Sequence, residues 1–130
     1  MIGLDLCLDT KCCNRLTVKL PRKYPRLQHI AGRFEYSQKI NYQPAYHHTD
    51  DKSLHLYYVH GKRNNDRWVI AWTVKNGQSE VYGNAWNEEK SQCPEKLSRQ
   101  WLTAESSIIE GLEIQCFSKI LNHYNYLDQG

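Results

Sequence analysis

The sequence lacks both the long apolar runs and the short catalytic signatures that would place it in a functional class. No stretch of its 130 residues approaches the ~18 consecutive apolar residues of a membrane-spanning helix. The opening MIGLDLCLDTKCC has no basic segment, and Asp5 and Asp9 interrupt its apolar residues, so we predict no signal peptide. This fits a cytosolic protein, or equally a piece of a longer secreted one. The motifs GxSxG, HExxH, the P-loop and GxGxxG are also missing, which argues against the enzymes that carry them.

Zinc-type cysteine spacing is absent as well. The five cysteines, at positions 7, 12, 13, 93 and 116, form neither a CxxC pair nor a zinc-finger pattern. Three lie near the start and two near the end, as expected if disulfides join the two ends of a small extracellular domain. The disulfide candidates are Cys12, Cys13, Cys93 and Cys116. The alternative is that all five are reduced and buried, since free cysteine is among the most buried residue types.

The sequence has few phenylalanines and only a small net charge. Nine Tyr and four Trp stand against two Phe, so most large rings carry a polar atom, which suits half-buried sheets and contact surfaces. The formal charge is +3, and its densest basic cluster comprises Lys19, Arg22, Lys23 and Arg26. This mild charge is less than a dedicated nucleic-acid binder needs, so nucleic acid is an unlikely partner. The alternative is a domain that binds nucleic acid or a partner through the basic segment Arg22 to Arg26, and such binding would be sensitive to salt.

Helical periodicity is rare, whereas two-residue alternation recurs along the chain. It predicts strands in RLTVKL (15–20), GRFEYS (32–37), SLHLYYVH (53–60), RWVIAWTV (67–74), SEVYGNAW (79–86) and LEIQCF (112–117). KINYQPAYHH (39–48) predicts a strand at a sheet edge, because Pro44 has no N–H for a ladder. In RWVIAWTV, we place Trp68, Ile70 and Trp72 on the interior face. Only PEKLSRQWL (94–102) and the tail CFSKILNHYNYL (116–127) allow a helical turn or two.

These strands and the turn signals between them predict an all-β fold. We expect a single antiparallel sandwich or open barrel of about seven strands, with a short irregular or helical C-terminal tail. A chain of 130 residues has the usual size of one domain. The organisation predicted is an N-terminal extension (1–11), a β domain (12–117) and a C-terminal tail (118–130).

The histidines of YHHTDDKSLHLYYVHG (46–61) raise the question of a metal or catalytic site. His47 and His48 point in opposite directions on an extended chain, so they cannot easily share an ion. One of them, with His55 or His60, is a weak candidate for a metal site, because a hairpin brings cross-strand side chains within ~5 Å. The favoured interpretation is a solvated turn without metal or cofactor.

Aromatic side chains offer a candidate binding surface. Tyr57 lies on the strand face opposite Leu54 and Leu56, and Tyr82 and Trp86 share one face of their strand. If that face is exposed, Tyr57, Tyr82 and Trp86 form a platform that stacks on a sugar ring or an apolar protein patch. If both faces of the sheet are covered, these rings belong to the core.

From Cys12 to Cys116 the order of landmarks resembles a small cysteine-stapled β module repeated in some invertebrate extracellular proteins. The similarity is carried by CCNRLTVKL, AGRFEY, INYQPAYHH, LHLYYV, RWVIAW, QCPEKLSRQW and LEIQC. It implies recognition or matrix building, without catalytic residues. Cys7 departs from the pattern.

The function predicted is therefore a noncatalytic extracellular recognition or structural module with a protein or glycan ligand. It would form part of a longer or processed secreted protein, and no oligomeric state is assigned. One alternative is a small hydrolase or metal-dependent enzyme that uses the His/Asp cluster at 47–60. The other is an intracellular, cytoplasmic nucleic-acid or partner-binding domain.

Overall fold

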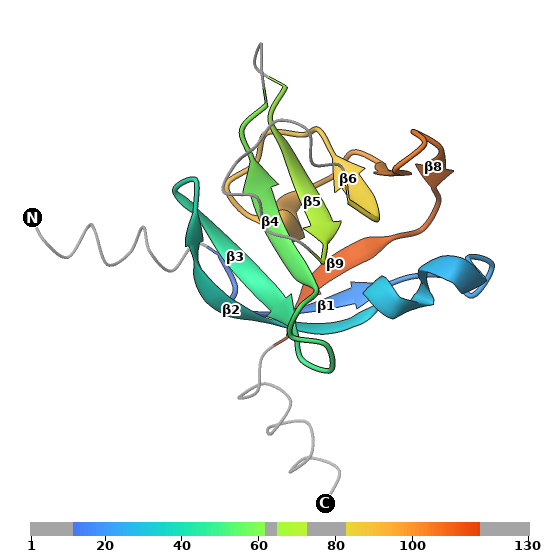
Figure 1. The fold of residues 1–130 in the computed structure, drawn as a ribbon, viewed down its shortest axis with the longest axis horizontal. Coiled ribbons are helices and arrows are strands. Elements are labelled where there is room, and N and C mark those ends of the chain that lie inside the picture. The colour runs from blue at the N-terminus through green and yellow to red at the C-terminus, as the bar shows by residue number, and fades with distance from the viewer. Residues whose placement is uncertain (1–11, 62–64, 73–82, 118–130) are drawn as a thin grey trace, which may run out of the picture.

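The computed structural model describes residues 12–61, 65–72 and 83–117, which form one strongly curled β-sheet (Figure 1). Its strands are β1 (Arg15–Lys19), β2 (Gly32–Ile40), β3 (Gln43–His48), β4 (His55–Val59), β5 (Arg67–Ala71), β6 (Ala85–Asn87), β7 (Trp101–Thr103), β8 (Ile108–Ile109) and β9 (Glu113–Cys116). Two short 3-10 helices interrupt them, η1 (Pro25–Ile30) and η3 (Pro94–Lys96). Within these described residues, no helix has the length and apolar character to cross a membrane.

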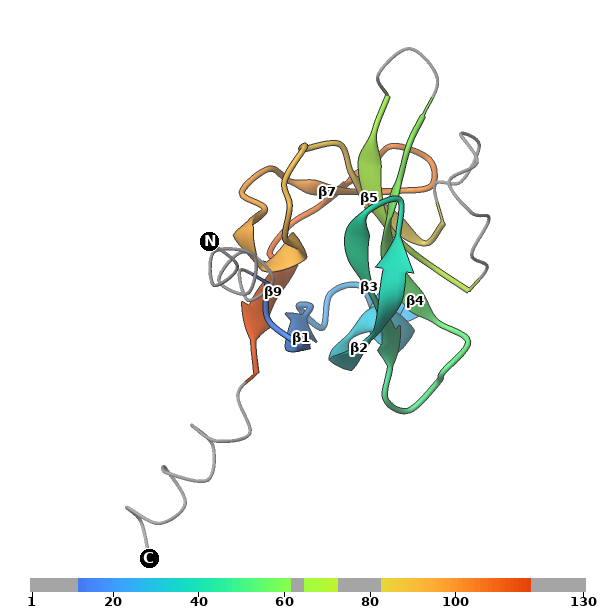
Figure 2. The same cartoon turned by 90° about the vertical axis from the view of Figure 1, so that its left-hand side faces the viewer.

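The strand order is β8-β7-β6-β5-β4-β3-β2-β1-β9, and every paired neighbour is antiparallel. The first and last strands lie side by side, and the sheet curls into a half-barrel, as the two views show (Figure 2). The all-β prediction is confirmed. The described residues hold nine strands in one continuous sheet, in place of about seven strands or two separate layers.

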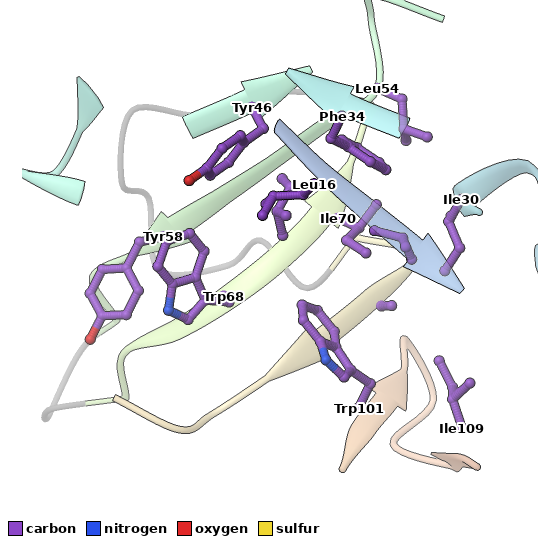
Figure 3. Close-up of a cluster of buried hydrophobic side chains, with 13 residues drawn as sticks. Leu16, Ile30, Phe34, Tyr46, Leu54, Tyr58, Trp68, Ile70, Trp101 and Ile109 are labelled. Atoms are coloured by element: carbon purple, nitrogen blue, oxygen red, sulfur yellow. The ribbon is translucent and has the colours of Figure 1, made fainter. Parts of the chain in front are cut away.

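The inner face of the half-barrel holds the main core (Figure 3). This core follows from the two-residue alternation in β4 and β5. Leu56 and Tyr58 of β4 point inward, beside Trp68 and Ile70 of β5. Trp68 is fully buried, and its Nε1–H donates to the carbonyl of Ser91 at 2.9 Å. The buried indole therefore keeps a hydrogen bond, as a buried polar group requires.

The outer face carries a second apolar cluster, so the central strands are buried on both sides. Its buried members are Ile40, Ala45, Tyr57, Val59, Val69, Ala71 and Trp86. All five residues of β5 are buried, as expected for a strand covered on both faces. The apolar run WVIA (68–71) in the sequence reflects this double burial.

The β2–β3 hairpin turns through Asn41 and Tyr42, whose φ angles are 55° and 67°. Two central residues with positive φ are typical of the type I′ turn that suits strand twist. Asn41 is held by a hydrogen bond from its side-chain amide to the carbonyl of Tyr58 at 2.9 Å, whereas Tyr42 is 92% exposed.

The prediction that 39–48 forms an edge strand is wrong, because β3 lies between β2 and β4. Ile40 and Gln43 flank the turn and form its hydrogen-bonded pair, so Lys39 and Pro44 form the next, non-hydrogen-bonded pair. The missing N–H of Pro44 thus faces β4, whose pairing with β3 begins only at Tyr46. Pro44 is tolerated inside the sheet because the hydrogen-bonded ladder between β3 and β4 does not extend to it.

The helical turn expected in PEKLSRQWL is present as η3 alone, because the following residues leave the helix and Trp101 begins β7. Trp101 is 3% exposed and belongs to the inner core. The tail expected to be irregular or helical (118–130) lies outside the described residues, as does the N-terminal extension (1–11).

Candidate functional site

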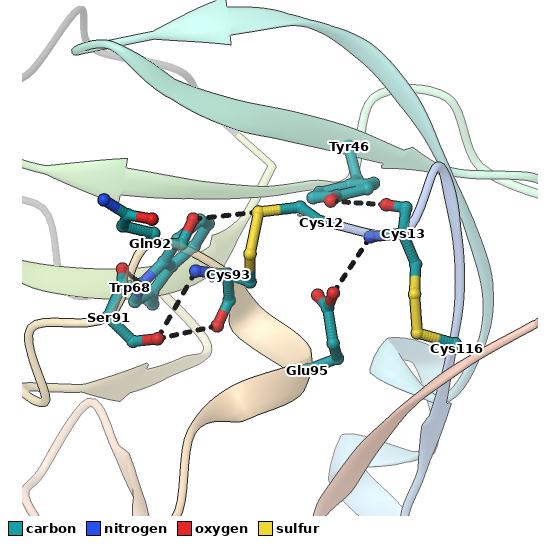
Figure 4. The surroundings of a disulfide bond; sticks show 9 residues. All are labelled: Cys12, Cys13, Tyr46, Trp68, Ser91, Gln92, Cys93, Glu95 and Cys116. Atoms are coloured by element: carbon teal, nitrogen blue, oxygen red, sulfur yellow. Dashed lines mark hydrogen bonds between the residues drawn. A yellow bond between two sulfur atoms is a disulfide. The ribbon is translucent and has the colours of Figure 1, made fainter. Parts of the chain in front are cut away.

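Two disulfide bonds join the segment that enters β1 to distant parts of the chain (Figure 4). Cys12 is bonded to Cys93, just before η3, and Cys13 is bonded to Cys116, the last residue of β9. The Cα atoms are 5.2 and 5.7 Å apart, within the range that disulfides adopt. The predicted bonding of Cys93 and Cys116 to the N-terminal cluster is confirmed, and it fits an oxidising environment. Cys7 lies outside the described residues.

The carboxylate of Glu95 lies between the two disulfides (Figure 4). Its Oε2 accepts a hydrogen bond from the N–H of Cys13 at 2.9 Å, while its Oε1 is buried without a hydrogen-bond partner. A carboxylate oxygen lies within 4.8 Å of the sulfur atoms of each disulfide. Metal ions bind thiolates, and sulfur atoms bonded to each other offer none. We therefore interpret this cluster as structural.

Tyr46 connects the disulfide region to the inner core. Its hydroxyl donates to the carbonyl of Cys13 at 2.7 Å, and its ring is fully buried. Burial raises the pKa of Tyr46 well above its ordinary value, and the nearby Glu95 carboxylate raises it further. The hydroxyl is thus a hydrogen-bond donor over the physiological pH range.

His48 is a structural residue, because both of its ring nitrogens are occupied. Nε2 lies 2.7 Å from the carbonyl of Ala31, and Nδ1 accepts the N–H of Asp50 at 3.0 Å. These partners require a neutral ring protonated on Nε2, so no nitrogen lone pair is left for a metal ion. Gly32 permits this packing: its φ is 126°, and a Cβ there would lie 2.7 Å from Nε2 of His48.

Of the other predicted histidines, His47 and His55 lie opposite each other, and His60 lies apart from them. His47 faces His55 across β3 and β4, and Glu35 faces His47 from β2. His60 follows the end of β4, with Nδ1 3.4 Å from the Asp66 carboxylate. Among the described residues, three potential ligands have atoms within 4.8 Å of one another only around the disulfides, so the histidines do not converge on one point here. His47, His48 and His55 lie on strands and not in the solvated turn that we favoured, whereas His60 lies just beyond β4.

The aromatic platform is not an exposed surface. Tyr57 is fully buried and Trp86 is 8% exposed, because both belong to the second apolar cluster. The Nε1–H of Trp86 donates to the carbonyl of Thr103 at 2.8 Å. Tyr82 lies outside the described residues. The alternative in which both sheet faces are covered therefore holds for these two rings.

Trp72 lies at the surface, against our expectation of an interior position. It follows the last residue of β5 and is 48% exposed. The ring of His29 stacks on it at 4.7 Å between centroids, and its Nε1–H donates to the Asp51 carboxylate at 2.9 Å. Hydrogen bonds from Ser53 and then Trp72 lower the pKa of Asp51. The two-residue alternation assigns a face to Trp72, but it does not show that β5 ends one residue before it.

A cleft of about 350 Å³ lies between β9 and the stretch from η3 to β7. Its lining residues are Pro94, Leu97, Ser98, Arg99, Trp101, Leu112, Glu113, Ile114 and Gln115. Its volume is within the usual range of ligand pockets. No sequence pattern predicts this cleft, because its two walls are separated along the chain and meet only when the sheet curls.

No family model matches this chain, and neither does any curated protein or solved structure.

Proposed function

We propose that this chain is a noncatalytic recognition module of an extracellular protein, and that it binds an extended segment of a partner protein along β9. The observation that carries the proposal is an unpaired sheet edge beside a cleft. Among the described residues, β9 pairs with β1 on one side and with no strand on the other. An exposed strand edge is a ready template for another chain.

The pairing of β9 with β1 indicates which backbone groups face the cleft side. The N–H of Phe117 donates to the carbonyl of Arg15 at 2.8 Å, so these two residues form a hydrogen-bonded pair. Because such pairs alternate along an antiparallel ladder, Ile114 and Cys116 direct their backbone groups away from β1. They are the groups that an added strand would meet.

The cleft supplies side-chain contacts beside this edge. The exposed lining of the cleft is mainly polar, with charges of both signs from Arg99 and Glu113, and Leu97 and Ile114 add a smaller apolar area. Backbone hydrogen bonds then provide affinity, and pockets for alternate side chains provide selectivity. Because the outward backbone groups of β9 can pair with another backbone, this arrangement favours an extended peptide with polar or charged residues at alternate positions over a glycan.

The disulfides support the extracellular part of the proposal. Such bonds persist in secreted and cell-surface proteins, where small domains use them to supplement a limited core. The resemblance of residues 12–117 to cysteine-stapled invertebrate modules agrees with this setting. The alternative of a hydrolase based on the His/Asp cluster is weakened, because His48 holds the fold and His60 lies apart from His47 and His55.

A display library of short linear peptides, selected on the full oxidised chain, tests the proposal. We expect the enriched peptides to share an extended motif with polar or charged residues at alternate positions. Ile114→Pro removes an outward N–H and leaves the ladder with β1 intact, so it should weaken their binding by at least about tenfold.

Ile108→Pro is the matched control, because it changes the opposite sheet edge. The N–H of Thr103 donates to the carbonyl of Ser107 at 2.8 Å, so by alternation Ile108 also directs its N–H outward. Peptide binding should survive Ile108→Pro. Failure to enrich any peptide, or equal loss with both proline variants, would contradict the proposal.

A further inference from the structure

A row of polar side chains crosses neighbouring strands on the outer face of the sheet. Arg15 of β1 faces Glu35 of β2, Glu35 faces His47 of β3, and His47 faces His55 of β4. Figure 1 shows β2, β3 and β4 side by side. Leu16, Phe34 and Leu56, their neighbours along the strands, belong to the inner core, so the row lies on the opposite face. It is therefore separate from the proposed peptide site.

The two histidines of this row form the closer kind of cross-strand pair. The N–H of His48 donates to the carbonyl of Leu54 at 2.8 Å, which makes that pair hydrogen-bonded. The adjacent pair, His47 and His55, is then non-hydrogen-bonded. In such pairs the Cα atoms are about 4.5 Å apart and the side chains approach each other closely. Two imidazoles so placed can reach one ion by rotation of their side chains.

Glu35 supplies a third ligand from the other side of His47. Its carboxylate is 3.8 Å from the Arg15 guanidinium, and its side chain is 46% exposed. An exposed ion pair of this length contributes little, so the carboxylate is free to turn toward His47. Two imidazoles and one carboxylate are a donor set that suits Zn²⁺ and leaves a fourth position open.

The state of His55 agrees with a role as a ligand. Burial lowers the pKa of His55, the proximity of His47 lowers it further, and the Ser53 backbone and Asp51 act in the opposite direction. Burial thus favours the neutral ring, which is the form that binds metal ions. Its Nδ1 is buried without a hydrogen-bond partner.

We propose that His47, His55 and Glu35 bind a divalent transition-metal ion of the Zn²⁺ class on the outer face of the sheet. The ion draws the three side chains together by rotamer changes, while the paired backbone stays in place. Three adjacent strands are then linked by one ion, and its open position accepts water or a donor atom from a partner.

The test is a calorimetric titration of Zn²⁺ into the oxidised full chain in a non-coordinating buffer at neutral pH. Every protein carries Cys7→Ser, so that the remaining thiol does not contribute. We expect one Zn²⁺ per chain. His47→Gln and His55→Gln should each weaken binding by at least about tenfold, and Glu35→Gln should weaken it less.

Two further variants complete the test: one should strengthen Zn²⁺ binding, and the other is a control that should leave it unchanged. Arg15→Gln removes a cation and releases Glu35, so it should strengthen Zn²⁺ binding severalfold, which no adventitious surface site explains. His60→Gln, outside the row, should leave the affinity unchanged. Equal affinity of the wild-type and His47→Gln chains would overturn the proposal, as would an absence of binding at millimolar Zn²⁺. Thermal unfolding of each metal-free variant verifies that it is folded.

Discussion

The central strands and the outer strands of this half-barrel are stabilised in different ways. Every residue of β5 is buried, and four of the five residues of β4 are buried. In β9, by contrast, no residue is fully buried, and β1 buries only Leu16 and Val18. Both disulfides connect to the segment that enters β1, and one of them ends on β9. Covalent links therefore occur where hydrophobic burial is weakest.

This contrast indicates how the poorly buried side of the curled sheet is held in place. The contribution of the hydrophobic effect is proportional to the apolar area removed from water, and β9 removes little. A disulfide stabilises mainly by limiting the unfolded ensemble, so its contribution does not depend on local burial. The disulfides and the core thus stabilise different parts of the molecule. Loss of a disulfide should mainly affect β1 and β9, and truncation in the core should mainly affect the central strands.

Removal of both disulfides together should have the largest effect, because the contributions of the two bonds combine. Replacement of Cys13 and Cys116 together by alanine should lower the free energy of unfolding by about 2–5 kcal/mol, and removal of the other pair by a similar amount. The measurement is urea denaturation of each double variant and of the oxidised parent. In hydrogen exchange, β1 and β9 should lose protection before β4 and β5. Uniform loss across all strands would contradict the division into two regions.

Truncation in the packed region should come next. Trp68→Ala should cost about 3–5 kcal/mol, because it removes a fully buried indole and leaves a cavity. Trp72→Ala is the matched control, since that ring is 48% exposed, and it should cost clearly less. The two losses are compared by chemical denaturation with the disulfides intact. Equal losses would show that burial in the inner core does not dominate the stability of the central strands.

A smaller effect is expected at the polar contact between β3 and the end of η1. His48→Ala should cost about 1–3 kcal/mol, because it leaves the carbonyl of Ala31 and the N–H of Asp50 without their partner. His47→Ala, at a partly exposed position, should cost less. Thermal unfolding of the two variants, recorded side by side, distinguishes them. A larger loss for His47→Ala would refute the structural role that we give to His48.

The smallest effect, and the only gain, is expected at the hairpin tip. Tyr42→Gly should stabilise the protein by up to about 1 kcal/mol, because it relieves a positive φ at a side chain that is 92% exposed. Asn41→Gly should bring no such gain, since it removes the hydrogen bond to the Tyr58 carbonyl. Differential scanning calorimetry measures both changes. Destabilisation by Tyr42→Gly would indicate that the tyrosine ring supports the turn.

The sequence predicted the features that depend on local alternation. The inward faces of β4 and β5 follow from the spacing of Leu56, Trp68 and Ile70, and the clustering of cysteines at the two ends predicted which groups bond. It did not predict the cleft, because that depends on how far the sheet curls. It also misplaced Trp72, since a two-residue period assigns a face to a side chain but does not say where the neighbouring strands stop.

The histidines show a similar limit. Opposite directions for His47 and His48 followed from the extended backbone, and the structure places them on different faces. The partner of each ring depended on register, which the sequence did not fix: one residue of slip would have put His47 in the interior. Glu35 was missed for this reason, because its position opposite His47 arises from the bulge-containing pairing of β2 and β3.

The pairing of β1 with β9 has a consequence for biosynthesis. Cys116 follows Cys13 by 103 positions, and this length of chain must leave the ribosome before β1 meets its final neighbour. At typical elongation rates this interval is roughly 5–20 s. During it, Leu16 and Val18 can be covered only from the β2 side, so the nascent chain offers an unfinished edge to chaperones and to oxidoreductases until translation passes β9.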